Sequence, residues 1–521
     1  DDVLALLEPE AAPTAERHAE TLVARGFVRP VTDGVLRFRH ALVQVAVYRA
    51  APKRLRAELH ERFTTLLEGR SPELGDVDEF AGYHFERAFG LRTELGEGAD
   101  IRATSLAAEG GRRLGAAGMR TFRRGDMPAT LNLLARATSL LPEGDPLSRE
   151  LRCNLGIALN AVGHIDRAIA VLAAVVTDSR RADDERMEAW ARLELEFVQS
   201  RRESRRGDHL LEAAAHGIPI FERAGDRRAL GRAWLFTGWV HGGHRSDHAA
   251  WADGAERALT HYREAPWPTS TCLGELAAAL YWGPTPVDDA VTRFEQLLED
   301  PSTDIVGAAY VRAMLGGALA QRGDVDRGRE LAESAQVTLE ELGHRLVALT
   351  YGATVRGEIE LLTGEGAAAE RIFRSICDGL SAAGDFGALA SRFSDLAEAL
   401  VVQGRLDEAE ACTELAERHA ADDDVNAQMM WRPVRATILA RRGAFAPAEE
   451  LARQGAEIAD GTDDLNRRAE AHRDLGDVLR LAERRSEAAA SFDRAVELFE
   501  LKGNAVGAAH VRALADDLAL V

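Results

Sequence analysis

The sequence is poor in the features that several large classes of protein require. Its four cysteines, Cys153, Cys272, Cys377 and Cys412, are scattered and form no C-x-x-C pair. We therefore expect reduced thiols and not a disulfide framework. No uninterrupted apolar run approaches the roughly 18 residues that a membrane span needs, and no signal-peptide pattern occurs at the start. These absences predict a cytoplasmic protein without a membrane partner.

Catalytic signatures are missing as well. The sequence contains no G-x-x-x-x-G-K-[ST] phosphate-binding loop, no G-x-S-x-G nucleophile motif and no H-E-x-x-H metal motif. It therefore offers no recognisable place for ATP phosphates, for an acyl intermediate or for a catalytic zinc. We expect no enzymatic activity and no cofactor in this chain.

What the chain has in excess is negative charge. Lys and Arg total 64 against 85 Asp and Glu, a formal net charge of −21. Such a surface repels nucleic acid, so we expect no nucleic-acid partner for the chain as a whole. Its 521 residues exceed one compact core and predict several domains or an extended array. The first residue, Asp1, is not an initiator Met, and we expect a piece of a longer polypeptide.

A pattern of about forty residues recurs through most of the chain. NLGIALNAVGHIDRAIAVLAAVV (154–176) and DLGDVLRLAERRSEAAASFDRAVEL (474–498) both carry Leu-Gly, a turn, and then small and large apolar residues at helical spacing. Segments 314–336 and 395–417 repeat the scheme. Glycine just past a periodic segment ends a helix, because it adopts left-handed backbone angles without a Cβ clash. Seven glycines are predicted to mark such turns: Gly125, Gly163, Gly207, Gly323, Gly364, Gly404 and Gly443.

The recurring pattern resembles the tetratricopeptide repeat, most closely at Leu475-Gly476, Ala488, Phe492 and Ala495. One helical hairpin cannot bury its apolar face alone, so stacking of neighbours is obligatory. We predict an all-α fold, a tetratricopeptide-like helical-hairpin solenoid preceded by a small winged-helix domain. About ten helix pairs are expected over 101–503 and a capping helix over 504–521, and the middle of the array, 184–300, matches the pattern least well.

The head of the chain follows another pattern. TAERHAETLVARGFVRPV (14–31) predicts a helix with Thr14 as N-cap and Gly26 as its stop, and Asp33-Gly34 predicts a tight turn before the strand-like VLRFR. Ten Lys and Arg against five Asp and Glu lie between residues 14 and 62, which leaves DNA binding by a transcription regulator as an alternative. The expected domains are a winged-helix-like domain over 1–70 and a helical connector over 71–100.

The stretch FRHALVQVAVY, with RLRAELHERF after it, resembles the winged-helix segment of large bacterial signalling NTPases of the STAND class. EFAGYHFERAFGLRTELG (79–96) and FRRGDMPATLNLLARATSLLP (122–142) resemble a subgroup associated with adenylate/guanylate-cyclase-like domains or large LuxR-type regulators. The resemblance covers roughly 14–180. It implies a nucleotide-binding domain upstream that holds ATP or ADP. The acidic, apolar end LADDLALV favours a cyclase-like output over a C-terminal DNA-binding domain.

In that class the winged helix carries a Met-His-Asp signature whose His contacts the phosphate of bound ADP. Phe38-Arg39-His40-Ala41-Leu42 lies at the corresponding place. The resemblance therefore implies phosphate sensing by His40, with Arg39 in place of Met. Ala41 replaces the Asp of the signature.

An aromatic cluster in the middle of the array has two readings. Its rings could form a ligand or partner surface on the concave face of the solenoid. They could instead fill the core where the small-residue pattern lapses, which is the commoner use of aromatics at helical spacing. The residues are Trp234, Trp239, Trp251, Tyr262, Trp267, Tyr281 and Trp282.

Two polar clusters lie nearby. WVHGGHRSDHAAW places His241, His244 and His248 close together, a weak zinc candidate that an inter-helix loop capped by Asp247 or Ser246 explains better. QSRRESRRGD forms a basic knot at a helix end, where cations complement the helix dipole or could dock an acidic partner. That knot consists of Arg201, Arg202, Arg205 and Arg206.

We therefore expect the sensor region of a bacterial signalling NTPase. The solenoid would bind a protein, peptide or small effector on its concave face, and the winged helix would relay this to the upstream domain. A passive protein–protein interaction scaffold is the alternative. A homo-oligomer is compatible with either hypothesis.

Overall fold

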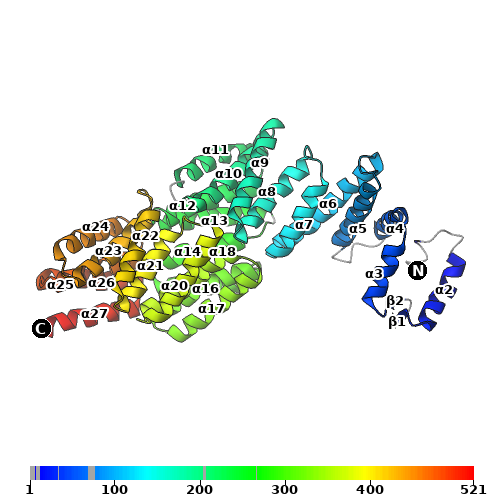
Figure 1. The fold of residues 1–521 in the computed structure, drawn as a ribbon. Coiled ribbons are helices and arrows are strands. Elements are labelled where there is room, and N and C mark those ends of the chain that lie inside the picture. Colours follow the sequence, from blue (N-terminus) through cyan, green and yellow to red (C-terminus); the bar gives the residue numbers. More distant parts are fainter. Residues whose placement is uncertain are drawn as a thin grey trace. The chain divides into compact units, whose positions relative to one another are not determined.

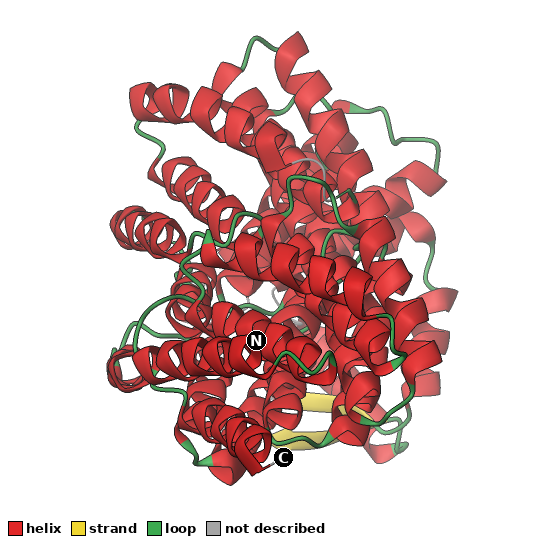
Figure 2. Cartoon of the chain, turned by 90° about the vertical axis from the view of Figure 1, so that its left-hand side faces the viewer, coloured by secondary structure: helices red, strands yellow, loops and turns green. Residues whose placement is uncertain are grey.

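The computed structural model describes residues 6, 12–32, 35–68, 77–203, 207–265 and 267–520. The chain divides into two compact units. Unit 1 comprises 1–122 and 129–154, and unit 2 comprises 123–128 and 155–521. Helices make up most of the described residues, and one two-stranded hairpin is their only β-sheet (Figure 2). The prediction of an all-α fold is confirmed.

The head of unit 1 consists of a helix, an antiparallel hairpin and three further helices. In the hairpin, Val28 pairs with Phe38, and the N–H of Arg39 donates to the carbonyl of Phe27 at 3.0 Å. The predicted Asp33-Gly34 turn lies outside the described residues. The elements are α2 (Ala12–Ala24), β1 (Val28–Thr32), β2 (Val35–Phe38), α3 (Ala41–Ala50), α4 (Lys53–Glu68) and α5 (Val77–Glu94).

One helix boundary of the head differs from its prediction. The first helix begins at Ala12, so Thr14 lies within it and the predicted N-cap is wrong. The helix can start earlier because the proline of the sequence APTAERH falls in its first turn, where the missing N–H costs nothing. Gly26 has a φ of 74°, as expected of the residue that ends this segment.

Helices α4 and α5 are joined by polar contacts between side chains that are largely shielded from water. The Tyr48 hydroxyl lies 2.9 Å from Nε2 of His60, whose Nδ1 lies 2.7 Å from Nδ1 of His84. Burial lowers the pKa of His60 to about 4 and also lowers that of His84. His60 is therefore neutral at pH 7, and the short contact between the two Nδ1 atoms is a hydrogen bond in which one ring donates and the other accepts.

From residue 101 onward the described helices follow one another as antiparallel hairpins (Figure 1). The first are α6 (Ile101–Arg123), α7 (Met127–Leu140), α8 (Pro146–Ala161) and α9 (Ile165–Arg181). The next four pairs are α10 (Glu185–Arg202) with α11 (Gly207–Ala224), α12 (Arg227–Gly243) with α13 (His248–Glu264), α14 (Ser270–Trp282) with α15 (Val287–Glu299), and α16 (Ile305–Arg322) with α17 (Val325–Glu341). In the pair after these, the first member is made of three consecutive segments, α18 (Arg345–Val347), the π-helix η2 (Ala348–Ala353) and α19 (Thr354–Leu362), and the second is α20 (Gly366–Ala383). The last three pairs are α21 (Leu389–Val402) with α22 (Leu406–His419), α23 (Val425–Arg441) with α24 (Phe445–Asp460), and α25 (Leu465–Leu481) with α26 (Arg485–Lys502). α27 (Ala505–Leu520) comes last.

Within unit 2 the two helices of a hairpin have different environments. The first helix of a pair is buried on most of its circumference, as in α14 and α16. The second is buried along one stripe, which in α17 consists of Gly328, Ala332, Ala335 and Leu339. A helix that is apolar all round belongs inside a protein, and an amphipathic one covers it. Unit 2 therefore has an inner layer of first helices and an outer layer of second helices.

Glycines of the inner helices receive the large side chains of the outer ones. A Cβ on Gly476 would lie 2.6 Å from a ring carbon of Phe492, and one on Gly357 would lie 2.4 Å from the ring of Phe373. The Leu-Gly of the repeat thus lets a phenylalanine lie flat against the backbone. Of the seven predicted turn glycines, six have positive φ, whereas Gly207 begins α11.

The inner layer of unit 2 curves until residues about 200 positions apart meet. Arg201 pairs with Asp385 at 2.5 Å, and Nδ1 of His248 lies 2.8 Å from Asp463, across 184 and 215 positions respectively. Where α23 begins, the N–H of Asn426 donates to the carbonyl of His244, the C-cap residue of α12, at 3.3 Å. One superhelical turn therefore closes on itself within unit 2. No described helix is long and apolar enough to cross a membrane.

Candidate functional site

The closed turn of unit 2 encloses a cavity of about 760 Å³, which lies within the range of ligand pockets. Its wall is made by inner helices that are far apart in sequence: α14, α16, α19, α21, α23 and α25, with α27 completing it. The cavity exists because the superhelix is closed, so no short stretch of sequence forms it.

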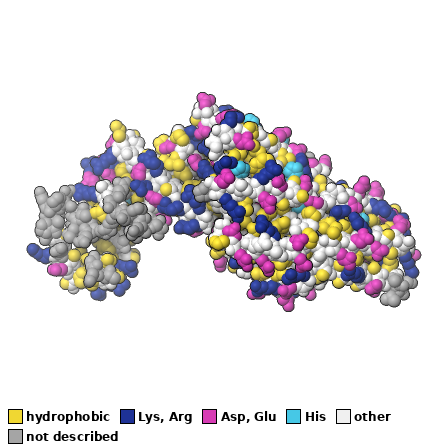
Figure 3. All heavy atoms as spheres, turned by 180° about the vertical axis from the view of Figure 1, so that it is seen from behind, with side chains coloured by type: hydrophobic (Ala, Val, Ile, Leu, Met, Phe, Trp, Pro, Cys, Tyr) yellow, Lys and Arg dark blue, Asp and Glu magenta, His cyan; other side chains and the backbone are white. Residues whose placement is uncertain are grey.

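Charged side chains dominate one wall of the cavity. The lining has seven carboxylates and four guanidinium groups, a formal excess of three negative charges. On the face of unit 2 seen in Figure 3, acidic and basic side chains are interspersed. Compared with this mixed surface, the cavity lining is enriched in carboxylates. They belong to Glu358, Asp395, Glu398, Asp464, Glu470, Asp474 and Asp477, and the guanidinium groups to Arg441, Arg467, Arg473 and Arg480.

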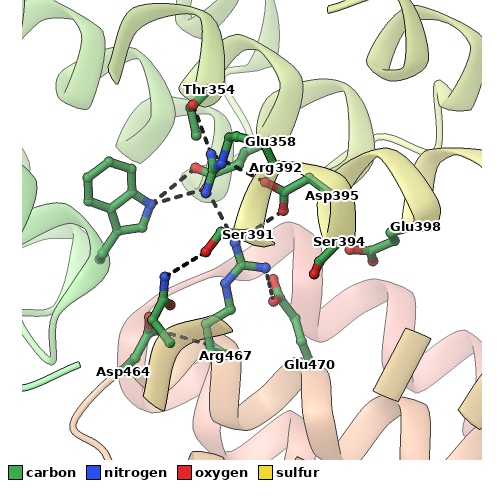
Figure 4. A network of polar contacts seen from close by, with 12 residues as sticks. Thr354, Glu358, Ser391, Arg392, Ser394, Asp395, Glu398, Asp464, Arg467 and Glu470 are labelled. Atoms are coloured by element: carbon green, nitrogen blue, oxygen red, sulfur yellow. Dashed lines mark hydrogen bonds and ion pairs between the residues drawn. The ribbon is translucent and has the colours of Figure 1, made fainter. Parts of the chain in front are cut away.

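Arg467 lies at the centre of the network (Figure 4). Its guanidinium is 2.9 Å from a carboxylate oxygen of Glu470 and 3.5 Å from oxygens of both Glu358 and Asp395. Asp464 caps the N-terminus of α25 by accepting a hydrogen bond from the backbone N–H of Arg467 at 3.0 Å. This bond fixes the backbone position from which the Arg467 side chain extends. One arginine therefore links α19, α21 and α25.

The other arginines of the lining are also engaged. Arg473 lies 2.9 Å from Glu398 and 2.8 Å from Asp474, and Arg480 lies 2.5 Å from Asp477. These pairs compensate part of the negative charge of the wall. The lining still has more carboxylates than guanidinium groups. Arg441 donates to the carbonyl of Val401 at 2.8 Å.

Two buried acceptor groups in the wall are incompletely satisfied. Asp395 is 1% exposed, and its carboxylate oxygens have only long contacts with guanidinium groups. Its charge contacts are Arg392 at 3.3 Å and Arg467 at 3.5 Å. Oε1 of Gln321, on α16, is buried without a donor. A buried acceptor that is incompletely satisfied costs free energy, so each is a place where an incoming donor is favoured.

Burial shifts the pKa values of the wall upward. Loss of water raises the pKa of both Asp395 and Glu358, against the opposing effect of the neighbouring arginines. The same cause raises the pKa of Glu470 to about 7 and that of Asp474 to about 6. An added positive charge would lower these pKa values again.

Two of the predicted aromatic residues reach the cavity. The Tyr281 hydroxyl and Nε1 of Trp282 both donate to the carboxylate of Glu358 at 3.2 Å. Trp251 stacks on Trp282 with centroids 6.2 Å apart and is itself buried. Tyr262 lies in the same core, against which Trp234, Trp239 and Trp267 are partly buried. The cluster is mainly packing, and its α14 end forms one side of the cavity.

The three histidines of the WVHGGHRSDHAAW segment have separate roles. His248 contacts Asp463 across the superhelical turn, and His244 is buried, which lowers its pKa to about 4. Nδ1 of His241 lies 3.6 Å from Asp247, whose carboxylate caps α13. No metal-binding cluster of His, Cys, Asp or Glu occurs among the residues that the structure describes.

The predicted basic residues occupy diverse places. Arg201 is 12% exposed and is held by Asp385, whereas Arg202 lies 3.2 Å from Asp166. Arg205 and Arg206 lie outside the described residues. In unit 1, Arg39 and His40 are exposed, and His40 is the N-cap residue of α3 without a side-chain hydrogen bond to that helix.

A buried lysine that the sequence reasoning missed holds one end of the cavity. Lys502, at the end of α26, is 1% exposed and is one of two lysines in the chain. Its Nζ donates to the carbonyls of Leu280, Gly283 and Thr285 at 3.3, 2.6 and 2.7 Å. Burial lowers its pKa to about 8, which still leaves it mostly protonated at pH 7. It fixes the end of α14, where Tyr281 and Trp282 lie.

Comparison with known proteins identifies the fold. No protein-family model and no curated protein matches the sequence. Among solved structures, the APC/C hetero-tetramer Cut9–Hcn1 matches with a TM-score of 0.56 at 10% identity, covering 99% of this chain and 92% of that one. The Rap protein complexed with Competence and Sporulation Factor gives 0.38 at 14% identity, covering 64% and 99%, and yeast Tom70 gives 0.33 at 12%, covering 88% and 96%. The chain therefore has the fold of a tetratricopeptide-like helical solenoid.

Proposed function

We propose that unit 2 is a recognition module that binds a peptide, or a segment of another protein, in its cavity. The observation that carries this proposal is a polar cavity of ligand size with buried acceptors that are incompletely satisfied. The charged side chains of the lining can contact polar and charged groups of a ligand, and the carboxylates outnumber the guanidinium groups. The similar Cut9–Hcn1 structure is a hetero-tetramer, an assembly of proteins that is consistent with this class of function.

A variant that fills the cavity tests this proposal. Val506, on α27, lines the cavity and is only partly buried, so Val506→Trp should narrow the space without disturbing the core. Octapeptides selected from a random display library on the native chain are expected to bind Val506→Trp at least about tenfold more weakly, which a lost contact of 1.4 kcal/mol suffices to produce. Fluorescence anisotropy of the labelled peptides measures this.

The matched control is Val337→Trp on the outer helix α17, where the side chain is 47% exposed and outside the lining. It should leave peptide affinity unchanged. Failure to select any peptide, or equal affinity for both variants, would overturn the proposal.

A regulatory role is the second part of the proposal. We propose that ligand binding by unit 2 is relayed through the winged-helix-like head to a nucleotide-binding domain upstream, because the FRHAL segment resembles that of STAND NTPases. The exposure of His40 at the start of α3 leaves its ring free to meet a phosphate. In the full-length parent, His40→Ala is expected to speed ADP release severalfold, measured with a fluorescent ADP analogue. An unchanged release rate would favour the passive scaffold instead.

The passive scaffold remains the alternative because the inner turn is closed by ion pairs such as Arg201–Asp385. A closed turn favours a fixed binding surface over a moving one. Peptide binding to unit 2 that leaves ADP release by the parent unchanged would select this alternative.

A further inference from the structure

We propose that the cavity of unit 2 recognises a positively charged side chain, an arginine or a lysine, of the bound peptide. This inference rests on the function proposed above and names the chemistry of its ligand. It starts from the charge balance of the cavity lining, in which carboxylates outnumber guanidinium groups by three. His510 also lines the cavity, and partial burial lowers its pKa, which disfavours a positive charge on its ring.

The arginines of the wall do not offer a complementary anion site. Arg467, Arg473 and Arg480 each lie within 2.9 Å of a carboxylate oxygen. An anionic ligand would have to compete with these internal pairs and would meet the excess carboxylates. A cationic ligand meets that excess directly, in a place largely shielded from water where charge interactions are strong.

The incompletely satisfied groups of the wall are acceptors. The buried carboxylate of Asp395 has only ion-pair contacts of 3.3 and 3.5 Å, and Oε1 of Gln321 is buried without a donor. Guanidinium and ammonium groups carry five and three N–H donors and no acceptor, so either group can satisfy them. A hydrogen bond between such a cation and a carboxylate is about twice as strong as a neutral one.

The aromatic side of the cavity suits the same ligand. Trp282 and Tyr281 line the cavity, and their polar atoms already donate to Glu358. What remains for a ligand is the ring surface, and the face of an indole attracts guanidinium and ammonium groups. The stem of an arginine or lysine can pack along such apolar surface while its head reaches the carboxylates.

The cavity should release protons when it binds a cation. Glu470 is faced by Arg467 and Arg473 of its own helix, by Asp464 at the start of that helix, and by Glu398 from α21. Because burial raises its pKa, part of the Glu470 population is protonated near neutral pH. A cation favours the charged form, so affinity for a basic peptide should rise with pH between about 6 and 8.

The test uses acetylated, amidated octapeptide pools of net charge +2, 0 and −2, with separate arginine and lysine arms in the +2 pool. Equilibrium dialysis against the full chain, read by mass spectrometry, measures the bound fraction. We expect the +2 pool to bind at least tenfold better than the others, and Asp395→Asn to reduce that binding at least tenfold. Asp326→Asn, a fully exposed carboxylate of α17, is the control for the overall negative charge and should have no effect.

The outcomes separate the two proposals. Binding of the neutral or acidic pool that Val506→Trp abolishes would overturn the charge preference and leave the peptide site standing, whereas no binding by any pool would overturn both. Equal +2 binding by Asp395→Asn and Asp326→Asn would overturn the assignment to the cavity. If Asp395→Asn does not fold, Gln321→Met, which removes the other buried acceptor, takes its place and should weaken +2 binding severalfold.

Discussion

Replacing Lys502 by methionine is expected to lower the free energy of unfolding of the C-terminal part of unit 2 by about 2–4 kcal/mol. The ammonium group of Lys502 satisfies the carbonyls of Leu280, Gly283 and Thr285. Methionine fills a similar volume, so the change removes the donors and leaves little cavity. Three buried acceptors would then lie without partners, each at a cost of about 1–3 kcal/mol, partly offset because the lysine charge no longer has to be buried.

The chain provides its own control for this prediction. The only other lysine, Lys53, is 46% exposed and pairs with Glu94 on the surface, so Lys53→Met should change stability by less than about 1 kcal/mol. Amide hydrogen exchange of α26 and α27 reports the local effect, since repeat arrays open by parts. Equal exchange in both variants would mean that Lys502 does not hold the superhelical turn closed. Lysine acylation gives a second readout: Lys53 should react quickly in the native chain and Lys502 slowly.

Replacing Arg467 by methionine should destabilise the contacts between α19, α21 and α25 by about 3–5 kcal/mol, the usual cost of removing one member of a buried ion pair. Its side chain is 16% exposed, and its guanidinium compensates the charges of Glu358, Asp395 and Glu470 together. Without it, these carboxylates face one another in a site largely shielded from water. Urea unfolding followed by circular dichroism, with hydrogen exchange to locate the change, measures the loss.

The loss caused by Arg467→Met should depend on pH in a definite direction. In the native chain burial raises the pKa of Glu470 from 4.5 to about 7, so between these values the folded state binds more protons than the unfolded state. Its contribution to the free energy of unfolding therefore falls as pH rises through that window. Removing the cation raises this pKa further, so the deficit of the variant should be smaller at pH 5 than at pH 8. A deficit that grew on acidification would contradict the ion-pair explanation.

The repeat architecture could be predicted from the sequence because its determinants are local. A Leu-Gly pair such as Leu475-Gly476 and a phenylalanine one helix later report a contact between adjacent helices. Gly125, Gly163 and Gly323 report backbone angles that few other residues adopt. Gly207 failed as a turn marker because glycine also tolerates an ordinary helical start, and the sequence does not say which conformation is used.

The cavity could not be predicted in this way. Contacts such as Arg201 with Asp385 join residues 184 positions apart, and no periodicity within one repeat encodes them. Charged residues of a repeat array are usually solvated, and Glu358 and Asp395 were therefore not distinguished from surface carboxylates. One signal was present: each lies on a first helix whose other positions are mostly small or apolar, an unusual place for a charge.

Amide hydrogen exchange of the whole chain tests most directly whether the cavity of unit 2 binds a basic peptide. It is measured with and without the best-binding peptide of the +2 pool. Exchange is expected to slow in the cavity-lining helices α19, α21 and α25 and to stay unchanged in the outer helices α20, α22 and α24. The same peptide should slow no exchange in Asp395→Asn. Protection confined to the outer helices, or the same protection in Asp395→Asn as in the native chain, would contradict the proposed site.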